Sequence, residues 1–549
     1  MVKIAIAQIN PTVGDLSGNR KLVQEAAARA TLASADLLVL SEMCLTGYPP
    51  MDLLTRKGFV KDQLRELETI RASTGDLAIC LGAVLPSETS QPKRLINAAV
   101  LLAEGREVAV QAKSLLPTYD VFDERRYFSA ATSRNTVTLP GNETQIGLTV
   151  CEDTWVDEID YGVDPVAELA ASGADLILNL AASPWHVEKP SKRRNLITEL
   201  AKSHGTPIVF VNQVGGNDEL IFDGGSFVAA ADGQILCQLP LFETAFHVVD
   251  VPTTSSTNPS LIAIEPEPVA QLEAALTLGI RDYFQKQDLP LGAVIGLSGG
   301  IDSAVTAHLA AKALGTDRVL GVAMPGPFSS DHSVSDAHAL ARKLGIEIRE
   351  VDIRPIYDAY LNVFRELFGS REDFGLTQQN IQSRIRGATL MAISNQEQRL
   401  VLATGNKSEL SLGYCTLYGD TVGGLAVLGD VYKRDVYALA HHANRNGEVI
   451  PQNTIEKPPS AELAPGQQDT NDLPPYDFVD AVLEQAIEGS QGIAGIQVAT
   501  ESERSAAQNV VHRLDRNEYK RRQMPLVLRT SPKAFGSGRR LPIVHRFKT

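Results

Sequence analysis

The chain has 549 residues and a formal net charge of −15, with 21% of its residues charged. At about 150 residues per domain, this length predicts two to four domains. The acidic balance argues against nucleic acid as a partner, and no apolar run approaches the length of a membrane span. Because the start of the chain does not resemble a signal peptide, we expect a cytoplasmic protein. Its five cysteines are widely scattered, so we expect neither disulfides nor structural zinc.

Residues 1–250 alternate short β-branched runs with helical patterns, which is typical of a layered α/β domain. The expected strands lie at 4–9, 37–40, 78–84, 98–102, 146–150, 176–180, 208–211 and 226–229. From Val251 this pattern stops, and a segment rich in Pro, Ser and Thr follows. We therefore predict a first domain over 1–250 and a linker over 251–268.

A second alternating region follows the linker. A helical pattern covers 269–284, and strands are expected from Val294 onward, then at 319–324, 346–351 and 399–403. Alternating strands and helices of this kind predict a doubly wound, parallel sheet that binds its ligand at the carboxyl ends of the strands. We place the second domain at 269–549.

The run from Val294 to Ser303 reads as an apolar strand, a glycine turn and the first turn of a helix. Backbone N–H groups in such a turn converge on phosphate oxygens, and the helix N-terminus adds the positive end of its dipole. The loop lacks the lysine of a Walker A motif, and Asp302 beside the phosphates suits Mg²⁺. The letters Ser-Gly-Gly-Ile-Asp-Ser resemble the PP-loop of the ATP pyrophosphatases, which split ATP between its α and β phosphates and adenylate an acceptor.

Three polar signals stand out in the first domain: Glu42, Lys113 and Cys151. Attack of a thiol on an amide needs a base for the thiol proton and a cation for the developing oxyanion. Taken singly, the cysteine is more often a buried thiol, and the two charged residues are more often exposed. Together the three contexts resemble the Glu-Lys-Cys triad of the nitrilase superfamily, whose fold is an α-β-β-α sandwich.

That resemblance implies that Glu42 is the general base, Lys113 the oxyanion cation and Cys151 the nucleophile. Glu124 matches an additional carboxylate of these sites, and a surface ion pair is the alternative explanation for it.

Other segments resemble the amidase domain of glutamine-dependent NAD⁺ synthetases, and they imply three glutamine-binding residues: Tyr119, Ser183 and Lys189. An amino acid zwitterion needs opposed polar partners, and the lysine suits its carboxylate. His186 matches no catalytic position, so we expect a structural or rim histidine. The remaining cysteines are interpreted as core or near-core thiols: Cys44, Cys80, Cys237 and Cys415.

Residues 269–549 resemble the NAD⁺ synthetase family in several segments, among them Leu376 to Gly387, Ala403 to Glu409, Tyr418 to Gly424 and Lys457 to Leu463. The resemblance implies the following ATP-binding residues: Gly296, Leu297, Ser298, Gly299, Gly300, Ile301, Asp302, Ser303, Thr404, Lys433 and Ser460. It implies contacts with the deamidated dinucleotide from Asn380, Glu409 and Lys533, and a Mg²⁺ site at Asp302 and Glu409.

The single-domain, ammonia-using synthetases carry other residues at the positions of Leu417, Gly424 and Pro532, so the sequence leaves the dinucleotide contacts there open. The whole pattern implies a ligase that amidates deamido-NAD⁺ to NAD⁺ through an adenylate. Its ammonia would come from glutamine, and its cofactor and co-substrate would be Mg²⁺ and ATP. We expect small-molecule substrates, no nucleic acid or membrane partner, and a homo-oligomer.

Two alternatives remain open at this point. The first is another PP-loop amidotransferase, acting on a purine nucleotide or on tRNA, although an acidic chain disfavours tRNA. The second is a regulatory fusion of an inactive amidase and a nucleotide-sensing domain, against which the intact Glu42, Lys113 and Cys151 argue.

Overall fold

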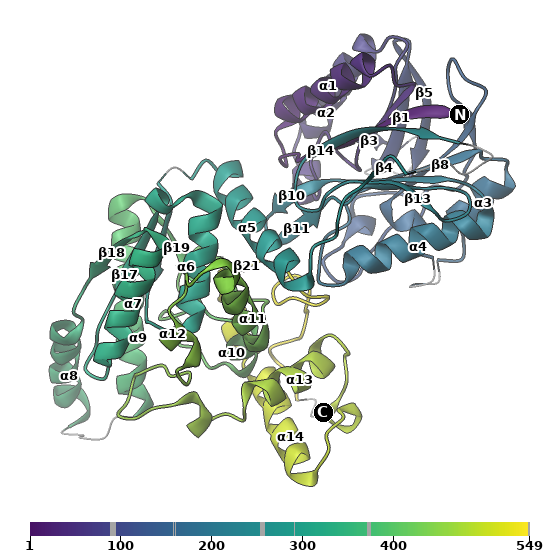
Figure 1. Ribbon diagram of the computed structural model, residues 1–549. Coiled ribbons are helices and arrows are strands. Elements are labelled where there is room, and N and C mark those ends of the chain that lie inside the picture. Colours follow the sequence, from purple (N-terminus) through teal and green to yellow (C-terminus); the bar gives the residue numbers. More distant parts are fainter. Residues whose placement is uncertain are drawn as a thin grey trace. The chain divides into compact units, whose positions relative to one another are not determined.

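The computed structural model describes residues 1–87, 95–156, 159, 161–252, 259–289, 291–369 and 375–546 (Figure 1). The chain divides into two compact units, unit 1 at Met1–Pro266 and unit 2 at Glu267–Thr549. Residues 253–258 of the predicted linker lie outside the described ranges. Within those ranges, no helix combines the length and the apolar character that a membrane span requires.

Unit 1 contains two mixed sheets. The first has the order β14-β1-β2-β3-β4-β5, and its strands are β1 (Val2–Gln8), β2 (Leu37–Val39), β3 (Ala78–Pro86), β4 (Leu95–Ala103), β5 (Arg106–Ala112) and β14 (Ala245–Val251). The second has the order β15-β13-β12-β9-β8-β7-β6, and its strands are β6 (Val137–Thr138), β7 (Gln145–Val150), β8 (Leu176–Ala181), β9 (Ile208–Asn212), β12 (Phe227–Ala229), β13 (Ile235–Gln238) and β15 (Leu261–Ile262). A separate hairpin pairs β10 (Val214–Asn217) with β11 (Leu220–Asp223).

Helices cover the outer faces of these sheets. The helices of unit 1 are α1 (Leu16–Leu32), α2 (Phe59–Ser73), α3 (Pro165–Ala171) and α4 (Lys189–His204), with short 3₁₀ turns η1 (Met51–Thr55), η2 (Glu124–Arg126) and η3 (Cys151–Thr154). Helices α1 and α2 pack on the first sheet, and α3 and α4 pack on the second. Strand β1 shows the layering, because Ile4 and Ile6 join the core between the sheets while Ala5 and Ala7 face the core under α1 and α2.

Unit 2 is built on one parallel sheet with the order β18-β17-β16-β19-β20-β21. Its strands are β16 (Ala293–Gly296), β17 (Val319–Ala323), β18 (Glu347–Glu350), β19 (Leu400–Ala403), β20 (Leu425–Ala426) and β21 (Leu526–Val527). The strand order reverses at β16, which has β17 on one side and β19 on the other. Ligands of doubly wound sheets bind at such a reversal, at the carboxyl ends of the strands.

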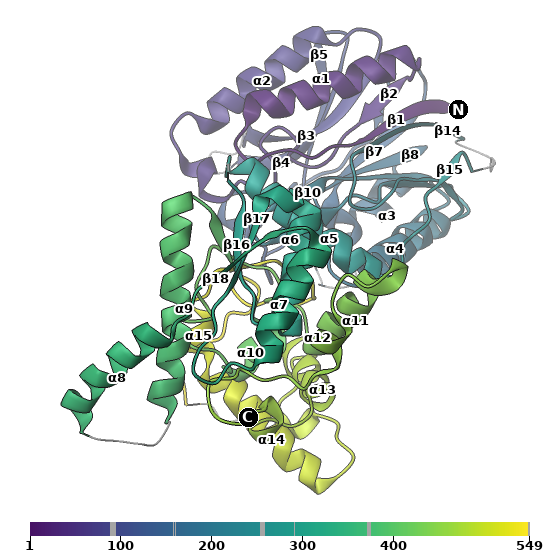
Figure 2. The same cartoon turned by 60° about the vertical axis from the view of Figure 1, so that its left-hand side comes forward.

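The helices of unit 2 are α5 (Pro268–Lys286), α6 (Ile301–Leu314), α7 (Asp331–Leu344), α8 (Arg354–Phe368), α9 (Leu376–Glu397), α10 (Lys407–Leu412), α11 (Lys433–Ala443), α12 (Gln452–Glu456), α13 (Tyr476–Ile487), α14 (Glu501–Arg516) and α15 (Glu518–Arg521). Its 3₁₀ turns are η4 (Thr316–Arg318), η5 (Asn444–Asn446), η6 (Asp469–Asn471) and η7 (Ile493–Gly495). Helices α6 and α9 both pack on β16, and they lie on either side of the sheet (Figure 2).

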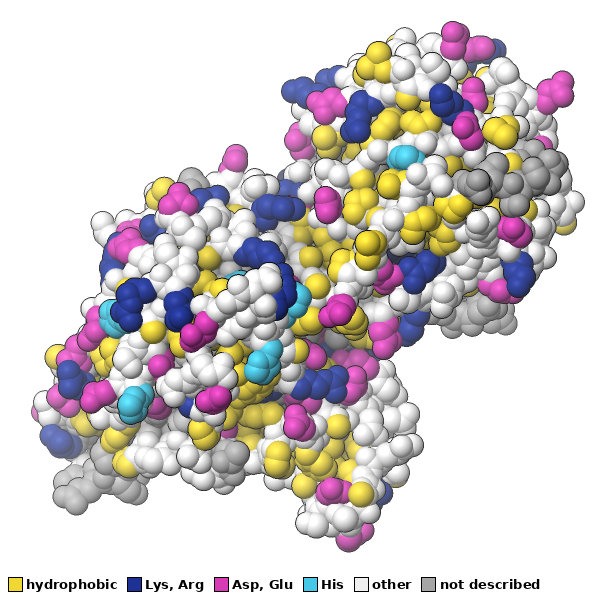
Figure 3. All heavy atoms as spheres, viewed as in Figure 1, with side chains coloured by type: hydrophobic (Ala, Val, Ile, Leu, Met, Phe, Trp, Pro, Cys, Tyr) yellow, Lys and Arg dark blue, Asp and Glu magenta, His cyan; other side chains and the backbone are white. Residues whose placement is uncertain are grey.

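These folds confirm the predicted classes, an α-β-β-α sandwich followed by a doubly wound parallel sheet. The strands expected from β-branched runs are all present. The strands that were not predicted are β5, β6, β10, β11, β13, β14, β15, β20 and β21, and four of these, β6, β15, β20 and β21, are only two residues long, too short to leave a pattern in the sequence. Part of the segment predicted as a linker is ordered in unit 1, since Leu261 and Ile262 pair with β13. On the face shown in Figure 3, acidic and basic side chains are interspersed.

Candidate functional sites

The glycine turn after β16 has the geometry of an anion site. Gly299 has a φ of +74°, and a Cβ atom there would lie 2.4 Å from the carbonyl oxygen of Ser333, so both the conformation and the close approach require glycine. The Ser303 hydroxyl donates to the Gly300 carbonyl at 2.9 Å, and its oxygen lies 3.3 Å from the Ser298 hydroxyl oxygen. Two hydroxyls and the N-terminus of α6 therefore lie together at the end of β16.

A cavity of about 630 Å³ opens at this turn. Most of the predicted ATP-binding residues line it: Gly296, Leu297, Ser298, Gly300, Ile301, Asp302, Ser303, Thr404, Lys433 and Ser460. Asn380 and Glu409, predicted to bind the dinucleotide, line it as well. Lys533 is not among the lining residues, and its ammonium lies 3.4 Å from the Ser490 hydroxyl. The structure therefore brings together the predicted ATP residues and two of the three predicted dinucleotide residues.

The Lys433 ammonium lies between two carboxylates in this cavity. It is 2.5 Å from Oδ2 of Asp302 and 3.4 Å from Oε1 of Glu409. Asn406 caps α10 and donates its side-chain amide to Asp302 at 2.8 Å. Burial and the negative charge of Asp302 raise the pKa of Glu409 to about 8, although Lys433 acts in the opposite direction. Above that pH both carboxylates are ionised, and their combined charge exceeds that of the one ammonium between them.

The carboxylate oxygens of Asp302 and Glu409 are suitable ligands for a divalent cation. Within the described residues there is no group of three or more His, Cys, Asp or Glu side chains that could hold a metal. Mg²⁺ is usually held by one or two carboxylates plus substrate phosphates and water, which matches a pair such as Asp302 and Glu409 beside a phosphate loop.

In unit 1, the buried Lys113 ammonium bridges two glutamates. It lies 2.8 Å from Oε1 of Glu42 and 2.8 Å from Oε1 of Glu124, and all three side chains are buried. Burial alone would lower the pKa of Lys113, but the charges of Glu124 and Glu42 together raise it well above its ordinary value. The lysine therefore stays cationic inside the fold. Glu124 is 4% exposed, so the alternative of a surface ion pair is wrong.

Cys151 lies at the start of η3, directly after β7, and has a φ of +43°. Asn179 and Thr154 both donate to its carbonyl oxygen. A positive φ at a non-glycine residue is strained and persists only where surrounding bonds hold it. Burial and the charge of Glu42 raise the pKa of the Cys151 thiol well above its ordinary value, against the opposing effect of Lys113. The resting Cys151 side chain is therefore a neutral thiol, close enough to Glu42 and Lys113 to feel the charge of each.

Asp153 joins the loop of Cys151 to the loop of Lys113. One of its oxygens accepts from the backbone N–H groups of Ser114 and Leu115 at 2.9 and 2.8 Å, and the other accepts from that of Val150 at 2.9 Å. A carboxylate that accepts hydrogen bonds from the backbone of two loops holds these loops together. Asp153 thereby fixes the residues after Lys113 relative to the residue before Cys151.

Glu152 lies among the residues predicted to bind glutamine. Its Oε1 accepts from the hydroxyls of Tyr119 and Tyr161 at 2.8 and 3.0 Å. The Lys189 ammonium lies 3.6 Å from the ring centroid of Trp155, which follows on the same turn. Burial raises the pKa of Glu152, although the charges of Lys113 and Lys189 act in the opposite direction. The structure thus brings Tyr119, Lys189 and a carboxylate together beside Cys151.

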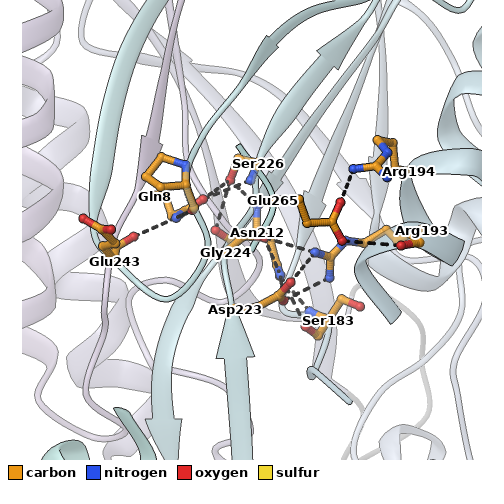
Figure 4. A network of polar contacts seen from close by, with 12 residues as sticks. Gln8, Ser183, Arg193, Arg194, Asn212, Asp223, Gly224, Ser226, Glu243 and Glu265 are labelled. Atoms are coloured by element: carbon orange, nitrogen blue, oxygen red, sulfur yellow. Dashed lines mark hydrogen bonds and ion pairs between the residues drawn. The ribbon is translucent and has the colours of Figure 1, made fainter. Parts of the chain in front are cut away.

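Ser183 follows β8 and is 3% exposed. Its backbone N–H donates to Asn212 Oδ1 at 2.8 Å, and a network of buried polar side chains continues behind it (Figure 4). His186 is mostly buried, and its Nδ1 lies 2.6 Å from the carbonyl oxygen of Val187. Three of the cysteines predicted for the core are buried, and Cys415 is partly buried.

Sequence reasoning missed several polar residues around Cys151: Asn97, Glu152, Asp153, Asn179 and Asn212. Asn97 donates to Glu42 at 2.6 Å, and its signal was a polar residue inside the apolar strand β4. Asn179 in β8 gave the same signal, whereas Asn212 is the last residue of β9 and followed the predicted strand. Glu152 and Asp153 directly follow Cys151 in the sequence, but sequence reasoning considered only the cysteine. A polar residue within an apolar strand is expected to have a buried partner.

Comparisons with known proteins agree with this two-part layout. Residues 3–258 match the family model described as carbon-nitrogen hydrolase, and residues 272–524 match the one described as NAD synthase. The chain is 43% identical to a glutamine-dependent NAD(+) synthetase of Synechocystis sp., over 100% of this chain and 99% of that one. It is 39% identical to the enzyme of that name from Thermotoga maritima, over 100% and 99%.

Among solved structures, the chain is similar to the glutamine-dependent NAD+ synthetase of Acinetobacter baumannii in complex with ADP. The TM-score is 0.77 at 36% sequence identity, and the match covers 99% of this chain and 98% of that one.

Gly82 generates a stability prediction for the first site. A Cβ atom at Gly82 would lie 2.2 Å from the backbone N of Met43 and 2.6 Å from Cα of Glu42, so β3 approaches Glu42 too closely for any side chain. Gly82→Ala should therefore displace Glu42 from Lys113 and lower the free energy of unfolding by about 1–3 kcal/mol. Denaturant melts measure this loss.

Gly75→Ala is the matched control, because a Cβ atom there has nothing within 4 Å. This control should change stability by less than about 0.5 kcal/mol. Equal stability of Gly82→Ala and the unsubstituted protein would show that the close approach at Glu42 is not a constraint.

Proposed function

This chain belongs to the glutamine-dependent NAD(+) synthetase family, and on that premise we propose that it is a ligase that amidates deamido-NAD⁺ to NAD⁺. ATP would activate the acceptor carboxylate, and glutamine would supply the ammonia. The observation that carries the proposal is the pairing of two sites in one chain. Unit 1 holds a thiol beside a buried lysine and two glutamates, and unit 2 holds a phosphate loop in a large cavity.

The proposed reaction in unit 1 begins at Cys151. Its sulfur attacks the side-chain amide carbon of glutamine, and Glu42 takes the thiol proton. The oxygen of the tetrahedral intermediate is stabilised by the Lys113 ammonium. Glu42 then returns the proton to the amide nitrogen, and the C–N bond breaks to give ammonia and a γ-glutamyl thioester. Water, deprotonated by Glu42, attacks the thioester and releases glutamate and the thiol.

Glutamine recognition in this proposal uses opposite charges at the two ends of the amino acid. Lys189 binds the α-carboxylate, and Ser183 and Tyr119 supply further polar contacts. We assign Glu152 as the partner for the α-ammonium, because Tyr119 donates to this carboxylate and the charge of Lys189 acts on it. A buried carboxylate beside a lysine suits a zwitterion and disfavours a ligand of net charge.

In unit 2, the proposed reaction is adenylation. The loop from Gly296 to Ser303 binds the ATP phosphates, with Thr404, Lys433 and Ser460 as further contacts. Asn380 and Glu409 contact the dinucleotide, and the expected contact from Lys533 requires this side chain to move into the cavity. The nicotinate carboxylate attacks the α-phosphorus, pyrophosphate leaves, and ammonia then displaces AMP to form the amide of NAD⁺.

Asp302 and Glu409 are the residues that would hold Mg²⁺ at this site. When bound, the ion neutralises charge that develops on the phosphates. Lys433 contributes a second positive charge from the protein itself, 2.5 Å from Asp302.

The first functional prediction concerns Cys151→Ala. The variant lacks the thiol that forms the acyl intermediate, so glutamine-dependent NAD⁺ formation should fall to background. Ammonium at high concentration and mildly alkaline pH should restore NAD⁺ formation, because free NH₃ reacts with the adenylate directly. Product analysis by mass spectrometry with each nitrogen donor measures both effects.

Cys237→Ala is the control, since Cys237 is also a buried thiol but lies in β13. It should keep glutamine-dependent synthesis. Glutamine-dependent synthesis by Cys151→Ala would remove the residue as nucleophile, and failure of ammonium in a folded variant would refute separate donor and acceptor sites.

The second prediction concerns Asp302→Asn. The substitution removes a negative charge from the pair that faces Lys433, so it should reduce synthesis with either donor by roughly 100-fold or more. It should also raise the Mg²⁺ concentration needed for half-maximal rate. Asp317→Asn, on an exposed turn of unit 2, should change neither quantity. An unaltered Mg²⁺ dependence would show that Asp302 has no metal role.

The third prediction concerns Glu152→Gln. A hydrogen bond to a charged group contributes about 1.5–3 kcal/mol, so losing the carboxylate should raise the KM for glutamine roughly tenfold or more. The rate with ammonium should not change. The KM for 4-carbamoylbutanoate, which lacks the α-ammonium, should change far less than that for glutamine. Glu168→Gln, at a glutamate whose side chain is 44% exposed and pairs with Arg134, is the control. Equal losses for both amides would place the ammonium partner elsewhere.

A further inference from the structure

A chain of buried polar side chains runs behind the predicted glutamine residue Ser183 (Figure 4). Its members come from elements far apart in the sequence, and each is at most 1% exposed: Gln8, Arg193, Asn212, Asp223 and Ser226. Buried polar groups cost free energy unless they are hydrogen-bonded, and a satisfied network holds its members in one arrangement. Such a network behind a ligand-binding residue can set that residue's position.

The network contacts Ser183 through Asn212, at the end of β9. The Ser183 N–H donates to Asn212 Oδ1 at 2.8 Å, and the Asn212 amide donates back to the Ser183 carbonyl at 3.3 Å. Both backbone polar groups of Ser183 are therefore held by one side chain. The Asn212 amide group is itself oriented by Asp223 Oδ1 at 3.2 Å and by the Gly224 carbonyl at 3.1 Å.

Asp223 is in turn held by Arg193 of α4. The guanidinium donates to both carboxylate oxygens, at 3.1 and 2.6 Å, and its carbon lies 5.2 Å from the ring centroid of Phe210. A two-pronged pair between planar groups fixes both position and orientation. This geometry ties α4 to the segment that orients Asn212.

Arg193 also follows Lys189 by four residues on α4, which is one helical turn. Lys189 is the first residue of that helix, so the position of its backbone depends on how the first turns of α4 are anchored. The next residue, Arg194, forms an ion pair with Glu265 (Figure 4). One buried arginine thus links two of the three residues predicted to bind the donor, Ser183 through Asn212 and Lys189 through the helix.

We propose that Arg193, acting through Asp223 and Asn212, is a positioning residue that sets the affinity of the amidase site for glutamine. This inference rests on the proposed function, since it assigns Ser183 and Lys189 to the donor. Arg193 does not contact the reacting atoms. Its loss should change glutamine binding and leave the chemistry of unit 2 unchanged.

The test is the double variant Arg193→Met with Asp223→Leu in the full chain. Replacing a buried ion pair by apolar residues of similar size is often neutral for stability, so the variant is expected to fold. The KM for glutamine should rise about tenfold, because small displacements of binding groups are costly. The kcat and KM measured with ammonium, and the melting temperature, should stay near those of the unsubstituted protein.

Arg20→Met with Glu66→Leu is the matched control. Arg20 and Glu66 form an ion pair at 2.5 Å between α1 and α2 of the same unit, and neither belongs to the network behind Ser183. This control should leave the KM for glutamine unchanged. A second variant, Arg193→Lys, keeps the positive charge but loses the two-pronged geometry, and it should give a smaller rise in the same KM.

An unchanged KM for glutamine in both Arg193 variants would overturn the proposal, and so would equal losses with glutamine and ammonium, which indicate a purely structural role. If the double variant does not fold, the Arg193→Lys measurement decides alone. Failure of the unsubstituted protein to use glutamine at all would instead refute the proposed function.

Discussion

The ion pairs of the buried Lys113 ammonium are the interaction on which the first site depends. A charge this deep inside a protein is tolerated only with close partners of opposite sign, and here Glu42 and Glu124 both lie at 2.8 Å. Glu42 and Glu124 lie in different segments of the chain, so their pairing with Lys113 also fixes the positions of those segments relative to each other. Asn97 and the N–H of Ala182 hold Glu42 in turn, at 2.6 and 2.9 Å, and thereby connect the first sheet to the segment after β8.

Unit 2 repeats this arrangement in a more open setting. Lys433 also lies between two carboxylates, Asp302 and Glu409, but all three line the large cavity. The difference in access has a chemical consequence. The lysine of unit 1 is enclosed and keeps the same partners, whereas the carboxylates of unit 2 can accept a further cation that arrives with a ligand. A fixed ammonium suits oxyanion stabilisation, and an accessible carboxylate pair suits a metal that comes with phosphates.

The sequence predicted the strands and the residues at their ends well, because both follow from local pattern. Apolar runs marked β7 and β16, and the residues after them, Cys151 and Asp302, lie where the topology of parallel strands puts them. The sequence predicted much less about burial and long-range partners. From the sequence, Glu124 could equally have been exposed, but the fold buries it beside Lys113. Lys533 lies in a matching motif, yet it is not among the residues that line the cavity. Pairings such as Arg193 with Asp223 depend on which loops meet, and no local pattern encodes that.

The electrostatics of the thiol show why the proposed amidase needs all three triad residues. Burial and the charge of Glu42 hold the Cys151 thiol in its neutral form, so a preformed thiolate is not available to react with other electrophiles. The same charge makes Glu42 the group that accepts the proton when the sulfur attacks. As the proton moves to Glu42, negative charge is lost from Glu42 and develops on the substrate oxygen. The Lys113 ammonium, which is held in place, stabilises this new charge. In the proposed mechanism the thiolate therefore forms only when an amide is bound to react with it, and one arrangement of charges both protects the thiol and activates it.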